Sequence, residues 1–431
     1  MSIVHDLVVD RAVLVTMNAQ REVVRGWIAI DDGAITSLGD GPAPAARDRV
    51  DAAGAIVHPG FVSAHQHSMD TPGRGAAGEA REFTDWLFGT YYSTVLGHSS
   101  ADAARAVQAT GAELARAGLT TVVDCWGVGG IGTARTDACL SASVHAATRT
   151  GLRWILAPMV SDRLPPGWEQ LLAQHPLAAD DLVASTEVAR RFAAWACGLA
   201  AGRIEVWGSV ELPEMATEEL LSGMAEVVRA GATGFTTHVC ASAPGAVDVS
   251  GERTVARLDR HRLLGRGTVG AHATFTDAAD RALLSDRGAG AAHCPAATML
   301  LGGTTSPLGV LREAGVPVGL GFDNATLNAT ADMAAEMRQA LMFDRVAGTG
   351  SARATARDVF AHATIDGARA IGRDDTLGSL EAGKRADLVV VELDTSAASG
   401  PVRDPMATLM WSTTVSDIRL VLVDGQPVYA S

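Results

Sequence analysis

Positive charge is scarce in this sequence of 431 residues, and lysine is almost missing. Charged residues make up 19% of the chain, the formal net charge is −14, and Lys384 is the one lysine. A protein that binds nucleic acid needs a basic patch to neutralise phosphates. The composition therefore excludes a nucleic-acid partner and favours a small-molecule ligand.

Paired cysteines, a basic leader and long apolar runs are also missing. The five cysteines are scattered without a CxxC pair, so neither a disulfide framework nor a structural zinc knot is indicated. The first residues, MSIVHDLVVDRAVLV, lack the basic start and apolar run of a signal peptide. No segment is apolar over the length of a membrane span. We expect a cytoplasmic protein without a membrane partner.

The middle of the chain alternates apolar runs with helical patterns. Most runs lack polar–apolar alternation, as expected for parallel strands buried on both faces. Eight such units predict a (β/α)₈ barrel. A doubly wound open sheet is the alternative, but no GxGxxG follows the first strand. The candidate strands are 56–64, 120–125, 153–160, 204–210, 234–239, 268–273, 290–293 and 316–321.

Both ends of the chain have a different texture, with short β-branched runs and Asp-Gly turns. We predict N-terminal strands at 6–17, 26–30 and 34–38, and C-terminal strands at 386–393, 418–423 and 427–429. The two ends should therefore form one small β-sandwich domain. The predicted boundaries are 1–57 and 376–431 for this domain and 58–375 for the barrel.

Histidine and aspartate residues stand where the predicted barrel strands end. His65 and His67 are two apart on the first strand, so both imidazoles project to the same face. In this type of barrel, active sites lie at the carboxyl ends of the strands. The same ends carry further candidates on other strands, namely His238, His272, His293 and Asp323.

Such a donor set predicts one kind of cofactor. Imidazoles with a carboxylate suit a borderline divalent ion, here zinc with iron as the alternative, better than magnesium or calcium. An open coordination position would hold water and lower its pKa towards neutrality. The sequence therefore predicts hydrolysis by a metal-activated water.

Long ordered motifs show a family resemblance over nearly the whole chain. HPGFVSAHQH (58–67), RGAAGEAREFTDWL (74–87), AHCPAATMLLGG (292–303), GVPVGLGFDN (315–324) and LGSLEAGKRADLVVVEL (377–393) carry it. With these motifs the sequence resembles the amidohydrolase superfamily, in its cytosine deaminase-like and atrazine chlorohydrolase-type branch. The resemblance implies a hydrolase of carbon–nitrogen bonds in small nitrogen heterocycles, and a homodimer.

The resemblance also implies residue roles. His65, His67, His238 and Asp323 match the metal ligands. His272 matches the histidine that polarises the substrate or stabilises the attacking water, and Asp323 can accept a proton from that water. Two-metal relatives bridge their ions with a lysine from strand four. Since Lys384 lies near the C-terminus, the site is expected to hold one ion.

One motif departs from the deaminases. Their strand-five motif is His-x-x-Glu, whereas this chain has His238-Val239-Cys240-Ala241. The glutamate delivers a proton to the ring, and loss of a general acid costs about 10²–10⁴ in rate. Candidates to replace it are Asp70, Glu79 and Glu211.

Substrate contacts are the least defined part of the sequence-based analysis. Trp86 and Trp126 can stack on a planar ring or simply fill loops, and Asn324 can position substrate or cap a turn. Asp70 and Glu79 complete the predicted substrate-binding set. The identity of the substrate and leaving group does not follow from the sequence.

Three functions remain open at this point. The first is hydrolysis at a carbon–nitrogen bond by deamination, group displacement or ring opening. The second is a metal-dependent lyase or isomerase on the same scaffold. The third is an inactive structural relative, which the retained ligand set disfavours.

Overall fold

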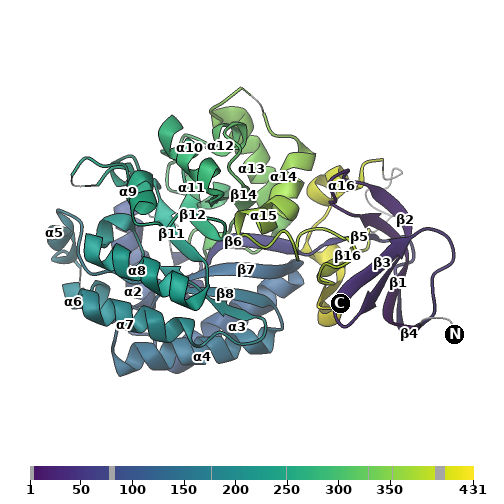
Figure 1. The fold of residues 1–431 in the computed structure, drawn as a ribbon, viewed down its shortest axis with the longest axis horizontal. Coiled ribbons are helices and arrows are strands. Elements are labelled where there is room, and N and C mark those ends of the chain that lie inside the picture. Colours follow the sequence, from purple (N-terminus) through teal and green to yellow (C-terminus); the bar gives the residue numbers. More distant parts are fainter. Residues whose placement is uncertain are drawn as a thin grey trace.

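A barrel of parallel strands and a smaller β-sheet make up the fold of the computed structural model (Figure 1). The structure describes residues 4–76, 83–175, 177–248, 250–328, 330–351, 353–393 and 403–431. Both ends of the chain lie in the smaller sheet, at one side of the barrel. Among the described residues, no helix combines the length and apolar character needed to cross a membrane.

The barrel strands pair in two parallel sheets that follow each other around a ring. The first sheet contains β15 (Asp323–Asn324), β6 (Phe61–His67), β7 (Leu119–Trp126), β8 (Arg153–Pro158) and β9 (Ile204–Val206). The second contains β10 (Gly208–Ser209), β11 (Phe235–Val239), β12 (Thr268–His272), β13 (Gly290–His293) and β14 (Val318–Leu320). Since β9 and β10 are two pieces of strand four, and β14 and β15 two pieces of strand eight, the ring has the eight strands of a TIM barrel. The predicted fold class is confirmed.

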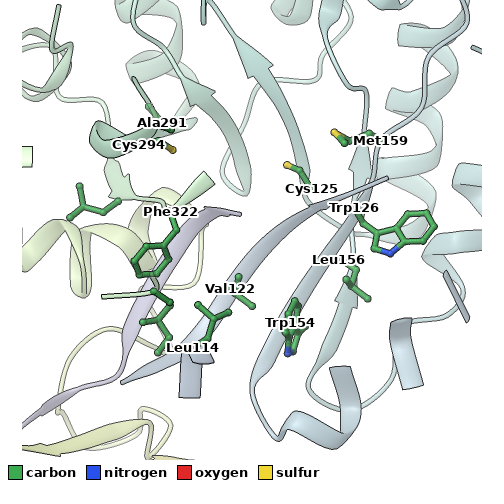
Figure 2. Close-up of a cluster of buried hydrophobic side chains, with 14 of the residues drawn as sticks. Leu114, Val122, Cys125, Trp126, Trp154, Leu156, Met159, Ala291, Cys294 and Phe322 are labelled. Atoms are coloured by element: carbon green, nitrogen blue, oxygen red, sulfur yellow. The ribbon is translucent and has the colours of Figure 1, made fainter. Parts of the chain in front are cut away.

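Helices surround these strands. One of the two longest, α3 (Ser100–Arg116), begins with a capping box between Ser99 and Asp102, and its apolar stripe includes Val107 and Leu114. Figure 2 shows part of the core that such stripes cover. The other helices of at least six residues are α4 (Ala134–Thr150), α7 (Thr186–Cys197), α8 (Glu218–Gly231), α9 (Thr254–Arg260), α10 (Ala278–Arg287), α11 (Pro295–Leu300), α12 (Leu308–Glu313), α13 (Met333–Ala347), α14 (Ala356–His362), α15 (Ile365–Ala370) and α16 (Pro405–Trp411). Short helices α1 (Phe83–Trp86), α2 (Tyr92–Val95), α5 (Trp168–Leu172) and α6 (Ala179–Leu182) lie in the loops.

The two ends of the chain join in one sheet of eight strands. Its path is β18 (Gln426–Ala430), β17 (Ile418–Val423), β16 (Leu388–Val391), β5 (Ile56–Pro59), β1 (His5–Val15), β2 (Val23–Asp31) and β3 (Ala34–Gly39). A further strand, β4 (Ala46–Asp51), pairs with β1. The sequence analysis missed β4 because its ARDRVD sequence is mostly charged.

Gly60 divides one extended segment between the two sheets. The sequence predicted a single strand over 56–64, whereas β5 belongs to the terminal sheet and β6 to the barrel. A Cβ atom at Gly60 would lie 2.1 Å from Oγ1 of Thr120. Only glycine permits this close approach to the neighbouring strand.

An ionic cluster connects the terminal sheet to the barrel. Asp424, in the turn after β17, forms ion pairs with Arg153 and Arg203 of the barrel and with Arg385. Its side chain is 13% exposed. Arg153 also donates to Asp387 at 2.7 Å. The carboxylate of Asp424 therefore balances the positive charge of three guanidinium groups at a partly buried interface.

We expect Asp424→Asn to lower the free energy of unfolding by about 2 kcal/mol, because it leaves these guanidinium groups without their shared counter-charge. Thermal unfolding at a fixed scan rate measures the change. The control is Asp51→Asn, which removes an exposed ion pair to Arg11 in the terminal sheet and should lower the melting temperature much less, because solvent screens exposed pairs. Equal melting temperatures for the two variants would contradict a connecting role for the cluster.

Candidate metal centre

Five polar side chains meet at the carboxyl ends of the barrel strands. His65 and His67 come from β6, and their rings lie 4.8 Å apart between centroids. His238 lies near the end of β11, His272 ends β12 and Asp323 begins β15. Their ligand atoms fall into overlapping groups within 4.8 Å of one another. The sequence placed all five at strand ends, and the structure brings them together.

Hydrogen bonds fix which imidazole nitrogens face the centre. Nδ1 of His67 lies 2.8 Å from the carbonyl oxygen of Cys125, and Nδ1 of His238 lies 2.6 Å from that of Glu211. Since a carbonyl can only accept, each Nδ1 carries the hydrogen and each Nε2 keeps its lone pair in the neutral ring. These two Nε2 atoms face each other at 3.2 Å. Two lone pairs directed at one point are the arrangement of metal-binding histidines.

The remaining donors complete this arrangement. Nε2 of His65 is buried and has no hydrogen-bond partner among the described residues. Oδ1 of Asp323 lies 3.3 Å from that atom and 3.5 Å from Nε2 of His67. Although burial opposes it, the neighbouring histidines lower the pKa of Asp323, so the carboxylate is ionised. Three imidazoles and one carboxylate fit a borderline divalent ion.

His272 lies next to this group on the side of the second Asp323 oxygen. Its Nε2 is 3.9 Å from Oδ2 of Asp323. Both residues adopt left-handed backbone, with φ of 71° at His272 and 64° at Asp323. Such conformations are costly for residues other than glycine and cluster at functional sites. The backbone strain thus lies at the strand ends that carry the polar groups.

A cavity of about 680 Å³ opens above these groups. This is within the usual range for a small-molecule site. Trp86 and Asn324 line it, as the sequence analysis proposed, and Nε1 of Trp86 donates to Oγ1 of Thr326 at 3.0 Å. His67, His238, His272 and Asp323 are also among its lining residues.

Two predicted substrate contacts do not reach the cavity. Trp126 is fully buried, its ring points away from Cys125 (Figure 2), and Nε1 donates to Ser143 of α4. Asp70 is also fully buried and accepts hydrogen bonds from the backbone of Ala325 and from Thr326. Trp126 therefore fills the core, and Asp70 holds the loop that follows Asp323. Glu79 lies outside the described residues.

Glu211 is the candidate replacement acid that the structure brings to the cavity. It follows strand four, lines the cavity, and accepts a 2.5 Å hydrogen bond from the hydroxyl of Tyr92. Burial raises the pKa of Glu211 to about 7, although the Tyr92 hydrogen bond opposes the rise. Ala241 lines the same cavity and offers only a methyl group.

Two residues at or next to the cavity, Glu214 and Tyr92, were not predicted from the sequence. Glu214 follows Glu211 on the same loop and lines the cavity, and Tyr92 holds Glu211 from the loop after strand one. No motif singles out Tyr92, whereas the Glu211-Leu212-Pro213-Glu214 sequence at a strand end was a readable signal. Cys240 lines the cavity too, but burial raises the pKa of its thiol to about 12, so it is not a thiolate nucleophile.

The single lysine lies far from this chemistry. Nζ of Lys384 donates to the carbonyl oxygens of Asp374 and Leu377 in the segment that returns to the terminal sheet. The strand-four position expected for a bridging lysine lies in or beside Ile204–Val206. The chain therefore has no lysine available to bridge two ions there.

The chain is similar in sequence to one family of proteins over most of its length. The model for the amidohydrolase family matches residues 56–428. The 5'-deoxyadenosine deaminase of Methanosarcina mazei is 27% identical over 425 residues, covering 98% of this chain and 92% of that protein. A 5-methylthioadenosine/S-adenosylhomocysteine deaminase of Halobacterium salinarum is 32% identical over 403 residues, covering 92% of this chain and 86% of the relative.

Solved structures share the fold. A zinc-bound adenosine deaminase from Xanthomonas campestris superposes with a TM-score of 0.85 at 23% identity, over 99% of this chain and 93% of that one. The zinc complex of atrazine chlorohydrolase from Arthrobacter aurescens gives 0.85 at 22% identity, over 98% and 94%.

Proposed function

The chain belongs to the amidohydrolase family and is a metal-dependent hydrolase of carbon–nitrogen bonds, and we propose that it deaminates a purine nucleoside or a similar amino-substituted heterocycle. The observation that carries this proposal is the convergence of His65, His67, His238 and Asp323 beneath a cavity of about 680 Å³. The deaminases of 5'-deoxyadenosine and 5-methylthioadenosine among its relatives supply the candidate substrates.

These four residues would hold one divalent ion, with zinc as the first candidate and iron as the second. The zinc-bound structures with this fold support that choice. Such an ion supplies a water of lowered pKa as the nucleophile.

The protein's own groups would then bind the ring and move protons. The ionised carboxylate of Asp323 would accept a proton from water, and His272 would donate a hydrogen bond to the reacting centre. The carboxyl group of Glu211 would exchange a proton with the ring, the role for which Ala241 has no suitable group. Trp86 and Asn324 would contact the substrate from the cavity wall.

Because Ala241 cannot protonate a ring, it favours a second candidate function, which is also hydrolysis. Displacement of another leaving group, or ring opening of a cyclic amide, needs the activated water and Asp323 but less help from a ring-protonating acid. The products distinguish the candidates, since deamination releases ammonia and ring opening adds the mass of water without ammonia release.

The test combines metal analysis with turnover. We expect about one zinc or iron per chain, and ammonia release from 5'-deoxyadenosine or 5-methylthioadenosine. A chelator should abolish turnover by removing the ion from its side-chain ligands. Added metal should restore turnover, because the ligands can bind an ion again. Protein with one metal per chain that releases no ammonia from aminopurines, pyrimidines or triazines would refute deamination. A metal content near zero after purification in metal-supplemented medium would refute the metal centre.

Three further properties are part of the proposal. The terminal sheet (1–57 and 376–431) and the barrel (58–375) would be two domains. The protein would be a cytoplasmic homodimer, and the free cysteines, most of them buried, suit a reducing compartment. Light scattering measures the oligomeric state directly.

A further inference from the structure

The described wall of the cavity carries acidic side chains, and burial raises the pKa of two of them, Glu211 and Glu214, to about 7. In addition to Asp323, its carboxylates are Glu211, Glu214 and Asp248, and no lysine or arginine is found among the described lining residues. The formal net charge of −14 has the same sign. A cavity lined by one sign of charge attracts ligands of the opposite sign and repels those of its own.

Glu214 is the carboxylate in this wall with hydrogen-bonding capacity to spare. It lies in the short helix Pro213–Met215 after strand four. Its Oε2 is buried and has no hydrogen-bond partner among the described residues. Its Oε1 occupies space that Gly245 leaves open, because a Cβ atom at Gly245 would lie 2.7 Å from it. Since burial raises the pKa of Glu214 to about 7, a cationic donor at Oε2 would supply the missing hydrogen bond and favour the ionised carboxylate.

The two arginines near Glu214, Arg163 and Arg257, lie outside the cavity lining. The guanidinium of Arg257 donates to Glu218 and to two backbone carbonyls, and its side chain is 1% exposed. Nε of Arg163 donates to the backbone oxygen of Glu214, and its Nη2 is buried without a hydrogen-bond partner among the described residues. Asp248 accepts three hydrogen bonds from its own turn. Neither arginine lines the cavity, so neither can receive an anionic substituent there.

The rest of the described wall is largely aromatic or apolar. Phe83 and Phe275 line the cavity and are 36% and 41% exposed, and Trp168 lies in the same wall. Aromatic faces bind planar rings and attract cations. These aromatic side chains offer no partner for a phosphate or a carboxylate, and the hydroxyl groups that also line the cavity, such as those of Ser242, Thr304 and Thr305, carry no positive charge.

From this distribution we propose that the cavity selects heterocycles that are neutral or cationic, with an amine or amidinium substituent donating to Glu214, and excludes phosphorylated and carboxylated analogues. The inference rests on the proposed function, because it defines the charge class of the substrate for the same site.

Three adenosine derivatives that differ at one position test it, namely 5'-amino-5'-deoxyadenosine, adenosine and adenosine 5'-monophosphate. Calorimetric binding to the metal-loaded enzyme is measured beside ammonia release. We expect the amine to bind at least about tenfold more tightly than adenosine, since hydrogen bonds to charged groups are worth more than neutral ones. The phosphate should bind most weakly. Equal or tighter binding of the phosphate, or no binding of the amine, would overturn the proposal.

Variants assign the effect to Glu214. Glu214→Gln should reduce the preference for the amine over adenosine by about tenfold. Gly245→Ala keeps the charge but displaces the carboxylate, and should lower the preference in the same direction. Glu187→Gln, at a side chain that is 73% exposed on α7, is the control. A preference for the amine that survives in Glu214→Gln would overturn the assignment. The expected binding order without ammonia release would refute the proposed deamination and support the charge selection.

Discussion

Replacing Asp323 by asparagine is expected to lower kcat by at least about 10³-fold for whichever aminoheterocycle the enzyme deaminates. Oδ1 of Asp323 lies 3.3 Å from Nε2 of His65, and Oδ2 faces His272 at 3.9 Å. Asparagine keeps the shape of this side chain but removes its charge and its ability to accept a proton from water. The measurement is the steady-state rate of ammonia release, with the metal content of each preparation determined in parallel.

The metal content separates two ways in which Asp323 can act. If Asp323→Asn retains about one ion per chain and loses turnover, the carboxylate acts in proton transfer. If the ion is lost as well, its role as a ligand dominates, as we expect for His67→Ala. The matched control is again Glu187→Gln, which should retain wild-type turnover and metal. Activity of Asp323→Asn within tenfold of the wild type would remove Asp323 from the site.

Glu211→Gln is the second variant with a large expected effect, a decrease of about 10²-fold in kcat for deamination. Glu211 lines the same cavity as Ala241, and its backbone oxygen accepts a hydrogen bond from Nδ1 of His238. Glutamine retains the hydrogen bond with Tyr92 but cannot exchange a proton. Tyr92→Phe removes only that hydrogen bond, so it should lower kcat less, by about tenfold.

A second substrate shows whether Glu211 transfers a proton or only supports the fold. Chloride is a better leaving group than ammonia, so its displacement from 6-chloropurine riboside depends less on protonation of the ring, and Glu211→Gln should slow it less than deamination. Placing glutamate at position 241 in the Glu211→Gln background should recover part of the deamination rate. An equal loss on both substrates, with metal retained, would indicate a positioning role instead. Loss of metal in Glu211→Gln would mean that the variant disturbs His238.

The barrel could be predicted from the sequence because its strands are apolar runs at regular spacing. Their ends could be located as well, and this is why His65, His67, His238, His272 and Asp323 were identified together. Local patterns failed where tertiary contacts decide the outcome. The strand β4 is mostly charged, and it forms because β1 offers its edge.

The direction in which each side chain points was the second feature that the sequence did not predict. Trp86 and Trp126 are equivalent as residue types, yet one lines the cavity and the other faces α4. Asp70 and Glu211 are both carboxylates after barrel strands, but Asp70 is taken up by the backbone of the neighbouring loop. The direction of a side chain depends on pairing across the barrel, which spacing along the chain does not record.

The division of one segment at Gly60 has a consequence for how the protein is made. The β6 histidines follow directly from β5, and β5 pairs with β16, which lies near the C-terminus. The strand β6 pairs on one side with β15, which carries Asp323. During synthesis on the ribosome, the histidines emerge early, while the strands that fix both ends of their segment emerge late. Assembly of the metal centre should therefore be one of the last events in folding, and a nascent chain released before β16 should bind no metal.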